Sequence, residues 1–159
     1  PKQEKRKIPT QLDNFPAPTV NTYSLETTIA EKIDAILSLM EFSSRMKDYY
    51  DIYYLANRFD FDGATLTKAL KKTFENRGHA FTVGQFEQVI GFVNDEAMQK
   101  KWNAFCRKID TDTEDYGIVL RKINNFLAKP FMAAVTDNDL TEHWISSVNE
   151  WRKKGVSYG

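Results

Sequence analysis

From Ser24 onward, apolar residues recur at intervals of three and four along almost the whole chain. This spacing places them on one face of an α-helix, which turns by about 100° per residue, and it does not fit the alternation of a β-strand. Residues able to cap helix N-termini precede several of these runs: Ser24, Ser43 or Ser44, Asp62, Thr82, and Asn94 or Asp95. The pattern predicts an all-α fold, a bundle of about seven helices without a strand.

Pro130 and the apolar spacing that follows it are the basis for predicting the last two helices. We expect the sixth helix, which contains Tyr116, to stop before Pro130, because proline lacks the N–H that continues a helix. The apolar spacing of residues 140–148 predicts a seventh helix. Trp144 and Trp151 would then form one stripe of that helix, packed on the bundle.

Residues 1–23 differ from the rest of the chain because they are rich in proline and show no periodic apolar pattern. We expect these residues to form an extended connector that follows an upstream domain. Residues 24–154 are expected to form one helical domain and residues 155–159 a tail. With 159 residues, 42% of them hydrophobic, the chain is long enough for one core.

The overall charge does not indicate a class of partner, since Lys plus Arg and Asp plus Glu both total 22. Short basic runs at 68–72, 100–101 and 152–154 are typical of solvated helix faces, although on one side of the fold they could guide an RNA. No apolar run approaches the ~18 residues needed to cross a bilayer. We therefore expect a cytoplasmic protein without membrane contact.

Charged residues fall on the apolar faces of the first two predicted helices. On the first helix, Lys32 lies inside the apolar arc, whereas Glu31 and Asp34 point to the solvated side. On the second helix, Arg45 and Asp48 lie among the apolar residues. Burying an unpaired charge costs several kcal/mol, so these groups must pair with one another or bind something charged.

Two explanations of these inward charges are open. The first is a structural network that fixes how the helices pack, pairing Lys32 with Asp48, and Arg45 with Asp51 at the edge of the arc. The second is a site in which Lys32 and Arg45 meet a polyphosphate and Asp48 handles a proton or a metal-bound group. Such groups suit phosphoryl or nucleotidyl transfer, where the protein mainly positions groups and neutralises charge.

Two motifs in this region resemble those of a known family. Residues 23–32 read Tyr-Ser-Leu-Glu-Thr-Thr-Ile-Ala-Glu-Lys, and residues 44–53 read Ser-Arg-Met-Lys-Asp-Tyr-Tyr-Asp-Ile-Tyr. They are similar to the Ala-Glu-Lys and Arg-x-Lys-Asp-x-x-Asp patterns on consecutive helices of AbiEii/AbiGii-type nucleotidyltransferase toxins. Residues 24–78 carry these family motifs, so the chain resembles the C-terminal helical part of such an enzyme.

The resemblance implies a fold like that of DNA polymerase β-type nucleotidyltransferases, with an upstream mixed-sheet domain. That domain would bring a Gly-Ser motif and a pair of acidic residues for Mg²⁺. The sequence contains no Gly-Ser dipeptide, and Asp110 and Asp112 follow the helical motifs and are not assigned this role. We therefore expect the sheet domain to be absent, no metal ligand in this chain, and no activity from the chain alone.

The roles of the family's residues carry over to matching positions. Lys32 would contact the triphosphate of the NTP substrate and take part in catalysis, and Arg45 would support the triphosphate or the charge of the transition state. Asp48 would be the catalytic carboxylate. Three further residues would support these side chains: Glu31, Lys47 and Asp51.

The function implied by the resemblance is NTP-dependent transfer of a nucleotide to an acceptor, such as tRNA. The enzyme would be a toxin of a bacterial toxin–antitoxin or phage-defence (abortive infection) system, with an antitoxin as its partner. The alternative is a helical interaction module without chemistry of its own, which binds an antitoxin or another partner chain.

Overall fold

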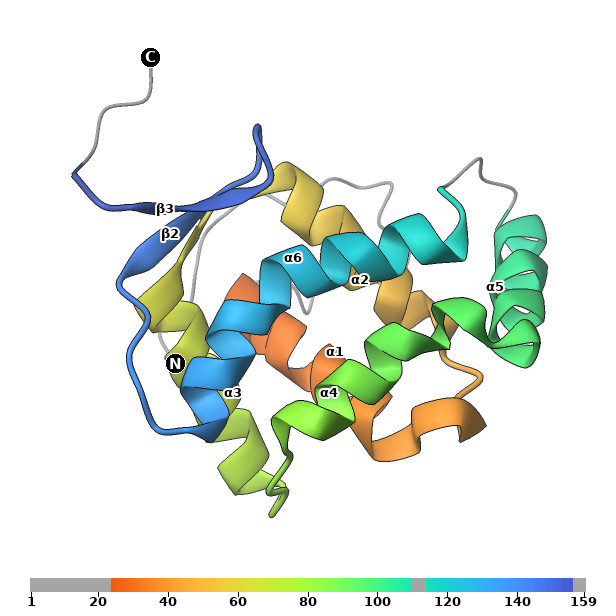
Figure 1. The fold of residues 1–159 in the computed structure, drawn as a ribbon, viewed down its shortest axis with the longest axis horizontal. Coiled ribbons are helices and arrows are strands. Elements are labelled where there is room, and N and C mark those ends of the chain that lie inside the picture. Colours follow the sequence, from red (N-terminus) through yellow and green to blue (C-terminus); the bar gives the residue numbers. More distant parts are fainter. Residues whose placement is uncertain (1–23, 110–113, 156–159) are drawn as a thin grey trace.

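The computed structural model describes residues 24–109 and 114–155. In these residues it contains six α-helices, two 3₁₀ helices and one small antiparallel sheet (Figure 1). In chain order the elements are α1 (Leu25–Leu39), η1 (Met40–Phe42), α2 (Met46–Arg58), β1 (Phe61–Asp62), α3 (Gly63–Asn76), α4 (Val83–Ile90), η2 (Gly91–Asn94), α5 (Glu96–Lys108), α6 (Tyr116–Val135), β2 (Glu142–Ile145) and β3 (Glu150–Lys153). The predicted connector at 1–23, the pair Asp110 and Asp112, and residues 156–159 of the predicted tail lie outside the described residues.

Helix α1 lies in the interior of the helical body and packs against α2, α3 and α4. Helix α6 packs against the same three helices, so that the core forms between α1 and α6. Ile29 and Ile33 of α1 and Phe126 of α6 are fully buried there. The sheet and α5 lie at opposite ends of the molecule (Figure 1). The all-α prediction is confirmed in its main point, because most of the described chain is helical.

Four predicted N-caps are confirmed, because each side chain accepts a hydrogen bond from the backbone N–H three residues later: Ser24 of α1, Asp62 of α3, Thr82 of α4 and Asp95 of α5. Helix α2 differs from the prediction and begins at Met46. The hydroxyl of Ser43 accepts a hydrogen bond from the backbone N–H of Arg45 at 3.0 Å. Ser43 therefore caps the turn that precedes α2, not the helix itself.

The predicted seventh helix is wrong, because residues 142–153 form a β-hairpin. Strands β2 and β3 are antiparallel with Trp144 opposite Trp151, and β1 adds a short third strand. Both indole rings pack on Phe126 of α6, with ring centroids 5.0 and 6.1 Å away. The turn between the strands contains Asn149 at φ 56, a conformation that asparagine tolerates better than most residues. Contacts distant in sequence thus override the helical spacing.

The prediction that the sixth helix stops before Pro130 is also wrong, because α6 runs through this proline. Proline has no N–H to donate to the carbonyl of Phe126, four residues earlier. The indole Nε1–H of Trp151 donates to that carbonyl instead, at 2.9 Å. In the same way, the indole of Trp144 donates at 2.8 Å to the carbonyl of Ala56 in the last turn of α2. The hairpin therefore supplies hydrogen bonds that two helices lack.

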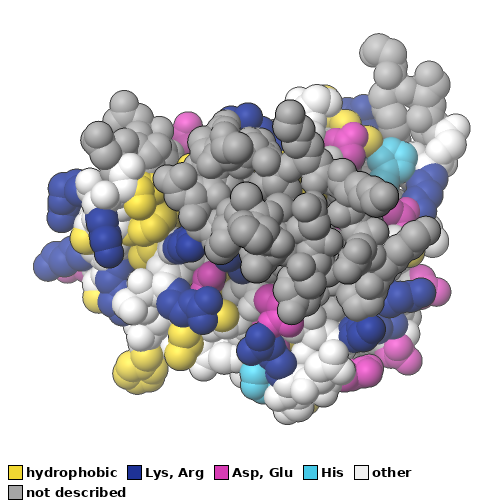
Figure 2. Space-filling view, turned by 180° about the vertical axis from the view of Figure 1, so that it is seen from behind, with side chains coloured by type: hydrophobic (Ala, Val, Ile, Leu, Met, Phe, Trp, Pro, Cys, Tyr) yellow, Lys and Arg dark blue, Asp and Glu magenta, His cyan; other side chains and the backbone are white. Residues whose placement is uncertain are grey.

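The three basic runs lie on or beside three different elements: α3, α5 and β3. Run 100–101 belongs to α5, which lies at the opposite end of the molecule from β3, the strand that holds most of run 152–154 (Figure 1). Run 68–72 lies on α3, where the Nζ atom of Lys71 is 2.9 Å from Asp137. On the opposite face from Figure 1, basic and acidic side chains are interspersed (Figure 2).

Candidate functional site

Four charged residues of the two motifs meet at the interface between α1 and α2. The Nζ atom of Lys32 lies 2.8 Å from Oδ2 of Asp51 and 3.4 Å from Oδ1 of Asp48. The Nε atom of Arg45 lies 2.9 Å from Oδ2 of Asp48. Asp48 therefore contacts both cations. We call these four residues, Lys32, Arg45, Asp48 and Asp51, the ion cluster.

The ion cluster follows from helix geometry. Asp48 and Asp51 are three residues apart on α2, so they share one helix face, and α1 packs against that face. Lys32 is 15% exposed and Asp48 only 3%, which confirms that both point inward. Asp51 is fully buried, not at the edge of the apolar face.

The inward orientation predicted for Arg45 is wrong, since this side chain is 58% exposed. The reason is that α2 begins one residue later, so Arg45 is its N-cap and does not lie on its apolar face. The predicted pairing of Arg45 with Asp51 is wrong as well. Arg45 pairs with Asp48, and Lys32 pairs with both carboxylates.

The pKa of the Asp51 carboxyl is raised by its surroundings. Burial raises its pKa from 3.8 to about 6, although the charge and hydrogen bond of Lys32 and the charge of Lys47 act in the opposite direction. Its Oδ1 atom has no hydrogen-bond partner among the described residues. Lys47 itself is exposed and acts on this carboxyl through its charge. With a pKa of about 6, Asp51 can exchange a proton near neutral pH.

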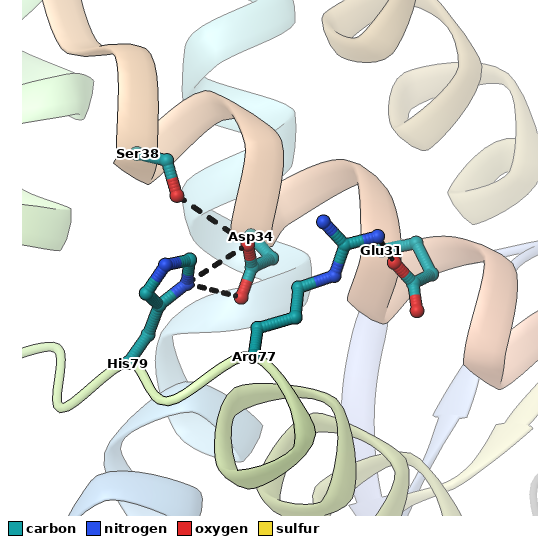
Figure 3. Close-up of polar contacts among 5 residues, drawn as sticks. All are labelled: Glu31, Asp34, Ser38, Arg77 and His79. Carbon is teal, nitrogen blue, oxygen red and sulfur yellow. Dashed lines mark hydrogen bonds and ion pairs between the residues drawn. The ribbon is translucent and has the colours of Figure 1, made fainter.

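The other face of α1 is attached to the C-terminal end of α3 and to the segment that follows it (Figure 3). Glu31 forms an ion pair with Arg77. Asp34 is only 1% exposed, and its two carboxylate oxygens lie 3.1 and 2.9 Å from Nδ1 of His79. The prediction that Asp34 is solvated is therefore wrong, because His79 covers that side of α1. No helical spacing could show this contact between residues 45 positions apart.

These contacts define how Glu31 is related to Lys32. Glu31 and Lys32 are adjacent in sequence, and each pairs with a different neighbouring element: Glu31 with Arg77 and Lys32 with α2. The two pairs hold α1 between α2 and the end of α3. Glu31 therefore links α1 to the C-terminal end of α3.

The described donors do not fit a Mg²⁺ ion. Among residues 24–109 and 114–155, no group of three or more His, Cys, Asp or Glu side chains is arranged to hold a metal. Both carboxylates of the ion cluster already contact a cation. We assign no metal-dependent step to these residues. Within the same residues, no helix is both long and apolar enough to cross a membrane.

The protein is mainly helical, and charged residues of its two sequence motifs meet in the ion cluster between α1 and α2. The family model described as nucleotidyl transferase AbiEii toxin of the type IV toxin–antitoxin system matches residues 1–137. The chain belongs to this family of nucleotidyltransferase toxins. A comparison with curated proteins and one with solved structures gave no match.

Proposed function

We propose that this chain forms the helical part of a nucleotidyltransferase active site that binds an NTP and transfers a nucleotide to an acceptor. The observation that carries the proposal is the ion cluster, in which both family motifs contribute charged groups within 3.4 Å of one another. Lys32 and Arg45 bind the triphosphate, and Asp48 acts as the catalytic carboxylate. Phosphoryl transfer suits such a site because it depends mainly on positioning and on neutralising charge.

The two cations have different parts in this proposal. Arg45 is mostly exposed and is oriented by the contact of its Nε atom with Asp48. Its planar guanidinium can contact a phosphate through two parallel N–H groups. Lys32 is enclosed between two carboxylates and acts as a fixed positive charge. Asp51, whose pKa is raised to about 6, takes up a proton when an anionic ligand approaches.

The competing interpretation is that the ion cluster only fixes the packing of α1 on α2 in a helical interaction module. Two cations facing two carboxylates also suit that role. Alanine at Lys32 does not separate the interpretations. It would remove the amine that contacts both buried carboxylates, and breaking a buried pair costs about 3–5 kcal/mol of stability.

Arg45→Gln provides a cleaner test, because this side chain is 58% exposed and Asp48 keeps its contact with Lys32. A matched control is Arg58→Gln at the other end of α2, about 20 Å away, where the arginine lies over the ring of Tyr54. The assay is calorimetric titration of each protein with ATP, CTP, GTP and UTP. We expect Arg45→Gln to weaken binding about tenfold, a loss of about 1.4 kcal/mol, and Arg58→Gln to leave it unchanged.

Equal affinities for the two variants, or no nucleotide binding by the wild type, would contradict the proposal. In either case the ion cluster would be a structural network. Unfolding curves of both variants serve as the check that the fold is retained.

The proposal extends to the metal, the acceptor and the partner. The sequence contains no Gly-Ser dipeptide, so we place the Mg²⁺-binding acidic residues outside these 159 residues and expect no transfer by the chain alone. The acceptor is an RNA such as tRNA, an antitoxin is the partner, and the location is the bacterial cytoplasm. Transfer of a radiolabelled nucleotide to tRNA by the complete enzyme, with Mg²⁺ present, tests the reaction. No label on RNA with any of the four NTPs would refute it.

A further inference from the structure

The backbone between α1 and α2 is fixed by a lysine from α5. We call residues 40–45 the linking turn. The Nζ atom of Lys101 donates hydrogen bonds to the carbonyl of Glu41 at 2.9 Å and to the carbonyl of Ser43 at 3.0 Å. The buried Ser43 also accepts a hydrogen bond from the N–H of Arg45. One ammonium group therefore holds the turn that leads into the ion cluster.

The linking turn is held in a conformation that the chain would not adopt freely. Met40 has φ 49, in the left-handed region, which residues other than glycine rarely enter. The backbone N–H of Ser43 donates to the carbonyl of Met40 at 3.2 Å. With the two bonds from Lys101, these contacts make the turn a defined structure.

The linking turn presents two side chains to solvent. Phe42 is 84% exposed, the highest value of any large hydrophobic residue in the described chain, and Arg45 is 58% exposed. The turn projects from the body of the molecule beside α5 (Figure 1). A phenylalanine in this position adds little to the core, so its aromatic ring is available to a ligand.

Phe42 lies within reach of the ion cluster. Three residues of extended chain span at most about 11 Å, which limits the separation of the Cα atoms of Phe42 and Arg45. The helical rise places the end of α1 about 10 Å beyond Lys32. These lengths are comparable to the span of a nucleotide from its phosphates to its base.

We propose that Phe42 stacks on a nucleobase whose phosphates lie at the ion cluster, and that Lys101 positions the linking turn for this contact. The inference rests on the proposed function and names the part of the substrate that the turn recognises. Every base has a π-face, so stacking on one aromatic ring tolerates different bases. A turn that is already fixed loses little conformational freedom on binding. Stacking on an aromatic ring is the same interaction for a base of the NTP and for a base of the acceptor RNA, so the base can belong to either ligand.

The test compares ligands with and without a base. Wild type and Phe42→Ala are titrated with the four NTPs, with inorganic tripolyphosphate and with a short single-stranded RNA. We expect Phe42→Ala to weaken binding of the NTPs or of the RNA about tenfold or more, and to leave tripolyphosphate binding unchanged. Phe42→Trp should retain the affinity. The matched control is Met132→Ala, which removes a 51% exposed side chain of α6 and should change none of these affinities.

A second pair of variants tests the positioning role of Lys101. Lys101→Met removes both hydrogen bonds to the linking turn, whereas Lys100→Met changes the exposed neighbour on the same helix. We expect only Lys101→Met to reduce the ratio of NTP or RNA affinity to tripolyphosphate affinity. Lys101→Arg should restore part of that ratio. A general loss of stability would lower all affinities together and leave the ratio unchanged.

The outcomes separate this inference from the proposed function. A loss confined to the NTPs assigns the base to the nucleotide substrate, and a loss confined to the RNA assigns it to the acceptor. If tripolyphosphate binds and Phe42→Ala changes the affinity for neither the NTPs nor the RNA, the stacking inference is wrong and the proposed function stands. If neither tripolyphosphate nor any NTP binds, both fail. If Phe42→Ala changes only self-association in sedimentation, Phe42 is a protein contact and the inference is overturned.

Discussion

The hydrogen bond from Trp151 to α6 gives the sharpest test of the fold. Trp151→Phe keeps an aromatic ring and removes the N–H that lies 2.9 Å from the carbonyl of Phe126. Pro130 cannot replace this donor. A buried carbonyl without a partner costs about 1–3 kcal/mol, and the smaller ring loses some apolar contact. We expect the free energy of unfolding to fall by about 2 kcal/mol.

A double-mutant cycle with Pro130→Ala isolates the hydrogen bond from the other effects of the substitution. Alanine at this position carries an N–H that can donate to the carbonyl of Phe126. Trp151→Phe should therefore cost about 1 kcal/mol less in the Pro130→Ala background than in the wild type. The measurement is urea unfolding at 25 °C followed by far-UV circular dichroism.

Trp102→Phe is the control for this cycle. Its indole donates to the carbonyl of Glu114 at 3.2 Å, and its neighbour Tyr116 at the start of α6 is about 20 Å along that helix from Pro130. Its effect should add to that of Pro130→Ala within about 0.5 kcal/mol. If Trp151→Phe costs the same with and without Pro130, the indole does not take the place of the missing helical hydrogen bond.

Three further predictions concern Asp51 and two glycines. Because burial raises the folded-state pKa of Asp51 from 3.8 to about 6, its contribution to stability is present at low pH and is lost as pH rises through this window. Urea unfolding of wild type and Asp51→Asn at pH 4 to 7 gives the difference between their free energies of unfolding. As pH rises, the wild type should lose at most about 3 kcal/mol relative to Asp51→Asn. A difference that stays constant with pH would show that Asp51 titrates normally. The same proton favours an anionic ligand, so calorimetry should show NTP affinity rising from pH 8 to 5.5 in the wild type and to a smaller extent in Asp51→Asn. Gly63→Ala should lower the free energy of unfolding by about 2 kcal/mol, because a Cβ there would overlap the carbonyl oxygen of Glu142. At Gly84 the atom nearest to an added Cβ is 3.7 Å away, so Gly84→Ala should be tolerated. Equal unfolding midpoints for the two glycine variants would contradict this.

The parts of the fold that depend on neighbouring residues could be predicted from the sequence. Caps such as Asp62 and Thr82 act within three residues, so the first turn of a helix is visible in the pattern. The hairpin could not be predicted, because Trp144 and Ile145 also fit a helical period. What decides the structure there is the packing of the two indoles on Phe126, which no local pattern contains.

The candidate site shows the same division between local and distant contacts. Lys32 and Asp48 could be placed on inward faces because each lies within a regular helix. Arg45 could not be placed, since its exposure depends on where α2 begins. The burial of Asp34 depends on His79, which Gly78 at φ 69 helps to turn toward α1 after α3 ends. Phe42 and Lys101 were missed for a related reason, because neither belongs to the two motifs.

The two indole hydrogen bonds have a consequence for how this protein should be divided into pieces. The family match ends at residue 137, before β2 begins at Glu142. A shortened protein that stops at the end of the match would leave two helical carbonyls, those of Ala56 and Phe126, without their indole donors. Similarity therefore marks a boundary that cuts through the folding unit. The residues beyond it are part of the framework that supports α2, the helix that carries Asp48 and Asp51.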